Sequence, residues 1–310
     1  MIVPEHVTRH ATPHVATHRL DEIVAVGAFR GHPATRPTEV DALNHVQQFG
    51  RGIAIGAALV VVVVGEEVPL RVEAQADGAA EAAVLAVLEA RTPGVGVLAE
   101  ESGRRSGSGD LEWCVDPLDG TTNFAHGFPF FATSVGLTWR GLPLLGALAA
   151  PALDQFFWAA PGQGAWCNDQ PIRVSGTGRL GDALLATGFA YDRTSRLDNN
   201  YAEFAWFTYR TRGVRRPGAA SLDLAYVAAG RLDGYWERGL SPWDLAAGVA
   251  LVEAAGGVVS SYGGTPLELS SGRLIACAPS LHPALIEGLR QCQPLPGHLY
   301  GAPELDPAEA

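Results

Sequence analysis

Two aspartates, Asp116 and Asp119, stand three residues apart at the end of an apolar run in the segment 113–124. Carboxylates this close repel each other unless a cation lies between them, and sets of oxygen ligands suit Mg²⁺, Mn²⁺ or Ca²⁺. The Gly-Thr-Thr-Asn sequence after Asp119 supplies a tight turn and a helix start with backbone N–H groups free to face an anion. The segment therefore predicts a buried strand that delivers a divalent-cation site beside a phosphate site.

Two simpler interpretations use the same residues. Asp-Pro and Asp-Gly dipeptides are common in turns, so residues 116–120 taken alone could form only a strand-to-helix turn. A calcium loop of the EF-hand type needs oxygen ligands at alternating positions and a closing Glu, and Pro117 and Leu118 break that alternation. Further carboxylates from other parts of the chain would favour the metal site.

Glu100 and Glu101 supply such carboxylates at the end of a short predicted strand, 95–99. The alternative for this pair is a solvated loop edge, because the flexible glycine-rich segment 103–109 follows. The choice depends on whether the ends of the two strands meet in the fold.

Two further aspartates stand at predicted helix starts. Asp77 is placed to cap a helix that continues to about Arg91. Asp244 follows Pro242 at the start of another helix, so it is either an ordinary N-cap or a metal ligand held there.

Composition excludes several classes of protein. The 310 residues are 47% hydrophobic and 18% charged, as in a globular protein, and all 22 basic residues are Arg. Without Lys, the chain is neither a P-loop NTPase nor a Schiff-base enzyme. The net charge of -11 disfavours a nucleic-acid surface. The four widely spaced cysteines suggest neither a zinc site nor a disulfide framework, which fits a reducing cytoplasm.

The chain is expected to have a tail and two regions. Residues 1–36 carry four His at four-residue spacing, but Pro13 and the absence of an apolar stripe favour a disordered tail over a metal-binding helix. The apolar run 53–64 is too short to span a membrane and is expected to be core. We expect an N-terminal α+β metal-binding region at 37–175, a C-terminal α/β region at 176–294 that completes the site, and a frayed end at 295–310.

Alternating apolar residues after the aspartate motif predict an antiparallel meander rather than a nucleotide-binding βαβ series. Small residues at 218–221 would let a ligand approach the backbone N–H groups at a helix start. The expected strands of the meander are 128–139, 142–150, 155–159 and 164–168. The expected elements of the second half are strands at 184–188, 232–237, 258–262 and 274–278, and helices at 197–208, 222–229 and 283–289.

Three segments taken together resemble the inositol monophosphatase family of Mg²⁺-dependent, lithium-sensitive phosphatases. They are Glu100-Glu101-Ser102, Asp116-Pro117-Leu118-Asp119-Gly120-Thr121-Thr122-Asn123-Phe124, and Trp243-Asp244-Leu245-Ala246-Ala247-Gly248 with Glu253-Ala254-Ala255-Gly256-Gly257 after it. The likeness runs from about residue 70 to 290 and keeps the order and spacing of the family. It implies a layered α/β fold, an αβαβα sandwich of the sugar-phosphatase type, and a homodimer.

Carried over residue by residue, the resemblance assigns roles. Metal ligands would be Glu100, Asp116, Asp119, Asp244 and the Leu118 carbonyl, and Glu100, Thr121 and Asp77 would be catalytic, with Asp77 supporting Thr121 in activating water. The backbone at Gly120, Thr121 and Thr122 would hold phosphate, and Gly218, Ala219, Ala220 and Glu237 would line the substrate side. Because the chain has no Lys, metal ions would supply most of the positive field that phosphomonoester hydrolysis needs.

The resemblance implies a Mg²⁺-dependent phosphomonoester hydrolase, with Mn²⁺ as a substitute, acting on a small phosphorylated polyol or sugar. Thr122-Asn123-Phe124 favours inositol-1-monophosphatase; the alternatives are fructose-1,6-bisphosphatase and a dinucleotide-phosphate or other sugar phosphatase. A regulatory binding protein with a vestigial metal site is the alternative outside enzymes. One departure favours it, because Ala74 stands where the family has Thr, and this puts the support of Thr121 in question.

Overall fold

The computed structural model describes residues 73–293 and 295, all of which belong to one of the two units into which the chain divides, Glu39–Ala310. The expectations for the tail 1–36, for the apolar run 53–64 and for most of the end 295–310 lie outside the described residues. Among the described residues, no helix is long and apolar enough to cross a membrane.

Sheet A has eight strands in the order β2-β1-β3-β4-β5-β6-β7-β8. From β3 to β8 each strand pairs antiparallel with the next, so the predicted meander is confirmed. The first strand, β1, instead pairs parallel to β3. The strands are β1 (Gly96–Ala99), β2 (Gly103–Arg105), β3 (Leu111–Asp119), β4 (Ala132–Trp139), β5 (Leu142–Ala150), β6 (Gln155–Ala160), β7 (Gly164–Cys167) and β8 (Gln170–Ile172).

Sheet B has five strands in the order β10-β9-β11-β13-β12. Strands β10, β9 and β11 are parallel, and β13 pairs antiparallel with both β11 and β12. The strands are β9 (Leu184–Thr187), β10 (Gly213–Arg215), β11 (Gly234–Arg238), β12 (Val258–Ser260) and β13 (Arg273–Cys277). Sequence patterns missed β10 because three residues are too few to show a period.

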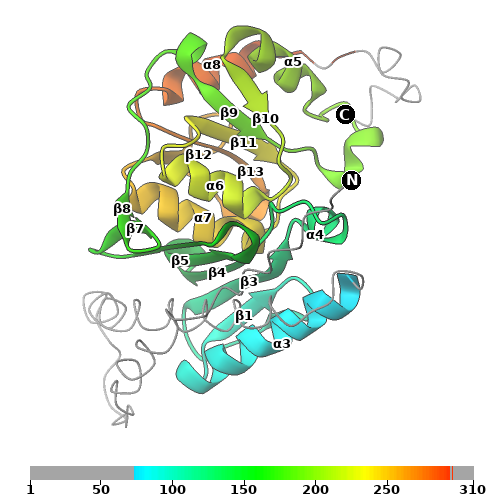
Figure 1. Ribbon diagram of the computed structural model, residues 1–310, viewed down its shortest axis with the longest axis vertical. Coiled ribbons are helices and arrows are strands. Elements are labelled where there is room, and N and C mark those ends of the chain that lie inside the picture. Colours follow the sequence, from blue (N-terminus) through cyan, green and yellow to red (C-terminus); the bar gives the residue numbers. More distant parts are fainter. Residues whose placement is uncertain (1–72, 294, 296–310) are drawn as a thin grey trace, which may run out of the picture. The chain divides into compact units, whose positions relative to one another are not determined.

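Helices separate and cover the two sheets (Figure 1). Helices α6 and α7 pack on each other and contact both sheets, whereas α3 contacts β3, and α5 and α8 contact β10 and β13. The predicted αβαβα sandwich is confirmed. The α-helices are α3 (Glu73–Arg91), α4 (Thr121–Ala125), α5 (Tyr201–Arg210), α6 (Ala220–Ala228), α7 (Pro242–Ala254) and α8 (His282–Gln291). Four short 3₁₀ helices are η1 (Pro151–Leu153), η2 (Leu180–Asp182), η3 (Tyr191–Thr194) and η4 (Leu269–Ser271).

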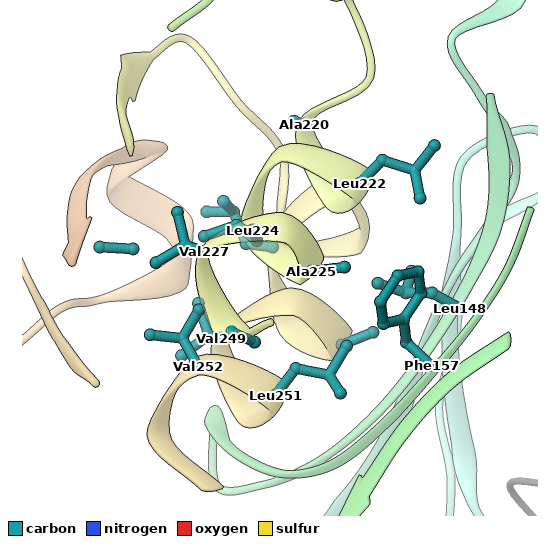
Figure 2. Close-up of a cluster of buried hydrophobic side chains, with 14 of the residues drawn as sticks. Leu148, Phe157, Ala220, Leu222, Leu224, Ala225, Val227, Val249, Leu251 and Val252 are labelled. Atoms are coloured by element: carbon teal, nitrogen blue, oxygen red, sulfur yellow. The ribbon is translucent and has the colours of Figure 1, made fainter. Parts of the chain in front are cut away.

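The largest apolar core lies around α6 and α7 (Figure 2). Leu222 and Leu224 of α6 and Leu251 of α7 are fully buried, together with Leu148 and Phe157 of sheet A. Burying a side chain of this size contributes about 1.5–3 kcal/mol. The two helices therefore form a shared inner layer that fixes sheet A and sheet B to each other.

Glycines let α7 lie directly on sheet A. A Cβ atom on Gly136 would lie 2.7 Å from Cβ of Ala246, and one on Gly146 would lie 2.3 Å from the carbonyl oxygen of Ala247. Gly248 likewise allows α7 to pack closely on α6, because a Cβ atom there would lie 2.6 Å from Cβ of Leu224. This close packing brings the first turn of α7 beside the end of β3.

Two sequence expectations about local structure were wrong. Asp77 lies inside α3 and not at its start, because Glu73 and the good helix formers after it extend the helix upstream. The segment expected to be flexible begins with β2, since Gly103, at φ 73°, turns the chain back onto β1. Sheet A ends at Ile172 and sheet B begins at Leu184, but α6 and α7 pack on both, so the proposed boundary at 175/176 stays a prediction.

Candidate active site

Strand β3 ends with the two aspartates that opened the sequence argument. The antiparallel register with β4 breaks between Asp116 and Asp119, so the strand is irregular where they stand. The backbone N–H of Leu118 donates to Oδ1 of Asp116 over 2.9 Å, and Gly120 then turns the chain with φ 93° into α4. The strand, the turn and the helix start are confirmed.

Glu100 reaches this strand end because β1 and β3 run parallel. Ala99 pairs with Val115, and the N–H of Glu100 donates to the Val115 carbonyl over 3.1 Å. The carboxyls of Glu100 and Asp116 share a hydrogen bond. The pKa of Asp116 is well above its usual range because it is buried and lies near Asp119, Asp244 and Glu100.

Glu81, which the sequence argument did not single out, anchors the Glu100 loop. Its carboxylate accepts the backbone N–H of Glu101 over 2.9 Å and that of Ser102 over 3.0 Å. Glu81 is buried on α3, one helical turn after Asp77. This spacing was the available signal, because residues four apart share a helix face. The loop is thus fixed by a buried carboxylate, and Glu100 projects from an ordered support.

Asp119 faces the start of α6. Its Oδ2 accepts the Ser221 N–H at 2.7 Å and the Ser221 hydroxyl at 2.5 Å, while its Oδ1 accepts the Ala220 N–H at 3.2 Å. Burial raises the pKa of Asp119 to about 6, although these hydrogen bonds oppose the shift. The helix N-terminus that was expected to present N–H groups to a ligand therefore gives two of them to Asp119.

Asp244 is not the N-cap of α7. Ser241 is the N-cap, and Asp244 is the third helical residue, whose Oδ2 accepts the Ser241 N–H over 2.7 Å in a capping box. The N-cap alternative for Asp244 is wrong because proline favours the first helical position, so Pro242 leaves the cap to Ser241. Burial first, and then the charge of Asp119, raise the pKa of Asp244 to about 8.

Thr121 and Asn123 fix the turn after Asp119. The Thr121 hydroxyl donates to the Leu118 carbonyl over 3.1 Å. The Asn123 amide donates to the Phe130 carbonyl over 2.7 Å and to the Pro217 carbonyl over 2.8 Å. Asn123 therefore connects α4 to the segment that leads into α6. The sequence alone did not predict this role, because Pro217 is distant in the chain.

The expected substrate side has a buried carboxylate at the end of β11. Glu237 accepts the Tyr235 hydroxyl on Oε2 over 2.5 Å, and burial raises its pKa to about 7. Gly188 makes room for it, because a Cβ atom there would lie 2.2 Å from each Glu237 carboxylate oxygen. Asp223 on α6 is a second buried acid nearby; burial and the charge of Glu237 hold its pKa well above its usual range.

A comparison with known protein families matches residues 62–294 to the inositol monophosphatase family. This chain belongs to the inositol monophosphatase family. It is 49% identical over 219 residues to an inositol-1-monophosphatase of Synechocystis, covering 69% of this chain and 75% of that protein. It is 45% identical over 207 residues to a Nus factor SuhB of Pseudomonas aeruginosa, covering 65% of this chain and 76% of that protein.

A solved structure has the same arrangement. The inositol monophosphatase of Anabaena (Nostoc) superimposes with a TM-score of 0.78 at 48% sequence identity, covering 80% of this chain and 98% of that one. Membership of the inositol monophosphatase family makes the chain a phosphoric monoester hydrolase, as the resemblance implied.

The four acidic side chains of this family member share one electrostatic environment. The pKa of Asp116 responds to the other three, and those of Asp119 and Asp244 are raised by the same group of charges. Within residues 73–293, however, no three Asp, Glu, His or Cys side chains are arranged so that they could hold an ion. The hydrogen bonds to Ser221 and Ser241 account for part of this, since they turn two carboxylates toward protein donors.

These carboxylates are the type of ligand that divalent cations bind. Hard oxygen ligands bind Mg²⁺, and a cation among mutually repelling carboxylates would relieve the repulsion that raises their pKa values. Asp77 is buried on α3, which comes close to α4. The pairing of Asp77 with Thr121 stays a prediction.

Proposed function

We propose that this chain hydrolyses inositol 1-phosphate with Mg²⁺ as the metal ion. The observation that carries the proposal is the shared environment of Glu100, Asp116, Asp119 and Asp244, which come from the turn after β1, from β3 and from α7. Proteins named inositol-1-monophosphatase among the relatives support the choice of substrate. The carboxylate of Glu237 supports a polyol, since it can accept hydrogen bonds from hydroxyl groups.

Glu100, Asp116, Asp119, Asp244 and the Leu118 carbonyl would hold the metal, either Mg²⁺ or Mn²⁺. When bound, such ions neutralise charge on the phosphoryl group and make water a better nucleophile. The protein already polarises the Leu118 carbonyl, because it accepts the Thr121 hydroxyl over 3.1 Å. A ligand carbonyl oriented in this way needs little rearrangement.

Thr121 orients the attacking water in this proposal. With its proton directed at Leu118, its Oγ1 keeps lone pairs that can accept a hydrogen bond from water. Asp77 supports Thr121, and the amides of Gly120, Thr121 and Thr122 hold the phosphate oxygens, as at other helix starts. Gly218, Ala219 and Ala220 line the polyol side with Glu237, where small side chains leave room for a ring.

Phosphate release from inositol 1-phosphate, with and without Mg²⁺, tests the proposal. The matched variant is Asp119→Asn, which keeps the shape of the side chain but removes its charge. We expect turnover to fall by roughly 10³-fold or more, as for other groups that stabilise a transition state electrostatically. Turnover of fructose 1,6-bisphosphate or a dinucleotide phosphate without turnover of inositol 1-phosphate would identify one of the alternative substrates instead.

A second candidate role is that of a binding partner in a larger assembly. Its support is the set of relatives named Nus factor SuhB, one of them 45% identical, and the Ala74 departure in the chain itself. The Asp119→Asn variant separates the two roles, because a binding role should survive the loss of turnover. A chain that lacks turnover when loaded with Mg²⁺ but complements a relative named Nus factor SuhB would favour this role.

The remaining expectations concern assembly and location. A homodimer in the cytoplasm is supported by the family resemblance and by the free state of the four cysteines, Cys114, Cys167, Cys277 and Cys292. Sedimentation equilibrium of the full chain measures the assembly directly, and a monomer at micromolar concentration would contradict the dimer.

A further inference from the structure

Arg216 lies beside the glycine that opens the polyol side of the site. A Cβ atom on Gly218 would lie 3.1 Å from Nη1 of Arg216 and 3.3 Å from Nδ2 of Asn123. Gly218 has φ 94°, a conformation in which glycine is strongly preferred. The guanidinium thus lies next to this glycine turn, which Asn123 of α4 also approaches.

The N–H donors of the Arg216 guanidinium have no protein acceptor among the described residues. Within the part of the chain that the structure describes, it makes neither a hydrogen bond nor an ion pair, and its side chain is exposed. Arg238, at the end of β11, differs because it pairs with Asp192 over 2.8 Å and is buried. An arginine presents five N–H donors in a planar fork, so Arg216 can still bind a ligand.

The charges around Arg216 distinguish it from a general surface residue. It lies close enough to Glu237 and Asp223 to lower the pKa of each, although neither carboxylate is within ion-pair distance. Glu237 can accept hydrogen bonds from neutral hydroxyls without a cation beside it. A guanidinium fork matches an oxyanion, which it binds through two parallel hydrogen bonds.

We propose that Arg216 is a specificity-determining residue that binds a second anionic group of the substrate, a phosphate on the polyol away from the bond that is cleaved. This inference rests on the proposed function for the position of the cleaved phosphate. It assigns to the chain a preference among phosphorylated polyols that the four acidic residues alone would not provide.

Matched substrate pairs test this role. Values of kcat/KM are measured for inositol 1-phosphate against inositol 1,4-bisphosphate, and for fructose 1-phosphate against fructose 1,6-bisphosphate, with the wild-type chain and Arg216→Gln. We expect the substitution to lower kcat/KM about 10- to 100-fold for each bisphosphate, the usual worth of a charge-assisted hydrogen bond. For the monophosphates we expect less than about a threefold change, since screened surface charges contribute little.

Arg215→Gln is the control, because Arg215 is also exposed but its Nη1 lies 3.0 Å from a Cβ atom placed on Gly213, away from Gly218. It should change none of the four values. Arg216→Lys should lose part of the effect, since a lysine keeps the charge but not the fork. An equal loss for monophosphates and bisphosphates in Arg216→Gln would overturn the inference, as would no loss for either.

Calorimetric titration with inositol 1,4-bisphosphate separates this inference from the proposed function. If the wild-type chain turns over none of the four esters but binds the bisphosphate 10-fold or more tightly than Arg216→Gln does, the proposed function fails and the role of Arg216 stands. If the two chains bind the bisphosphate equally, or neither binds it, the role of Arg216 is refuted whatever the turnover.

Discussion

Gly188→Ala tests the role of Glu237 without touching an acidic residue. The new Cβ atom would lie 2.2 Å from both carboxylate oxygens, well short of the 3.4 Å at which ordinary contact begins, so the carboxylate must move by about 1 Å. The Tyr235 hydroxyl, which now donates to Oε2 over 2.5 Å, would lose its partner in the process. A displacement of about 1 Å at a binding group can cost about 100-fold in rate.

We expect kcat/KM for inositol 1-phosphate to fall about 10- to 100-fold, which is about 1.4–2.8 kcal/mol of lost interaction. The loss should lie mainly in KM, because hydroxyl binding by Glu237 is the same before and during the reaction. Steady-state kinetics and thermal unfolding are measured together. Gly181→Ala is the control, since a Cβ atom there meets no atom within 4 Å.

The double variant Gly188→Ala, Glu237→Gln makes the test specific. If the glycine acts only by making room for Glu237, the two changes should not add, because the second removes what the first displaces. Wild-type kinetics in Gly188→Ala would refute this account of Glu237. A large fall in the unfolding temperature with unchanged KM at permissive temperature would show that Gly188 matters for packing alone.

Three more outcomes follow from the described contacts. Gly146→Ala should destabilise the fold by about 1–3 kcal/mol in urea, because its Cβ atom would meet backbone of α7 at 2.3 Å; Gly176→Ala, with nothing within 4 Å, is the control, and equal stabilities would contradict the packing account. Glu81→Gln should lower stability by about 1–3 kcal/mol and reduce turnover, because one backbone N–H of the Glu100 loop loses its acceptor; unchanged turnover would show that the loop needs no such support. Chelator-treated protein should unfold at a lower temperature at pH 8 than at pH 5. Its raised carboxyl pKa values are about 6 for Asp119, about 7 for Glu237 and about 8 for Asp244. Folding therefore favours the protonated forms, a contribution that is complete below about pH 4 and is lost as the pH rises through these values. Mg²⁺ added at pH 8 should restore the unfolding temperature, and a chelated protein whose unfolding temperature rises from pH 5 to pH 8 would contradict this sign.

The sequence predicted well those parts of the fold that are determined by residues close together in the chain. The meander from β3 to β8 follows from alternating apolar residues with short turns, so each strand specifies its neighbour. The aspartate motif was readable for the same reason, because residues 116–124 contain their own strand end, turn and helix start. Family resemblance then joined Glu100 and Asp244 to it across the chain.

The missed features depend on partners far along the chain. Asn123 contacts Pro217, and Ser221 contacts Asp119 across 102 residues, so no local period could reveal either bond. The contact of Glu81 with the loop at Glu101 and Ser102 was missed for a related reason, because a glutamate on a helix is usually exposed to solvent. The N-cap alternative for Asp244 was wrong, because Ser241 takes the cap and Pro242 takes the first helical position.

The bond between Asp119 and Ser221 also has a consequence for synthesis of the chain. When β3 leaves the ribosome, the residues that will donate to Asp119 have not yet been made, and Asp244 comes later still. The meander of sheet A can pair as it emerges, since its contacts are close in sequence. The proposed site, by contrast, is complete only when α6 and α7 pack between the sheets. A chain that stops before α6 would therefore carry acidic groups at the end of β3 without the Ala220 and Ser221 donors that bind Asp119 in the complete fold.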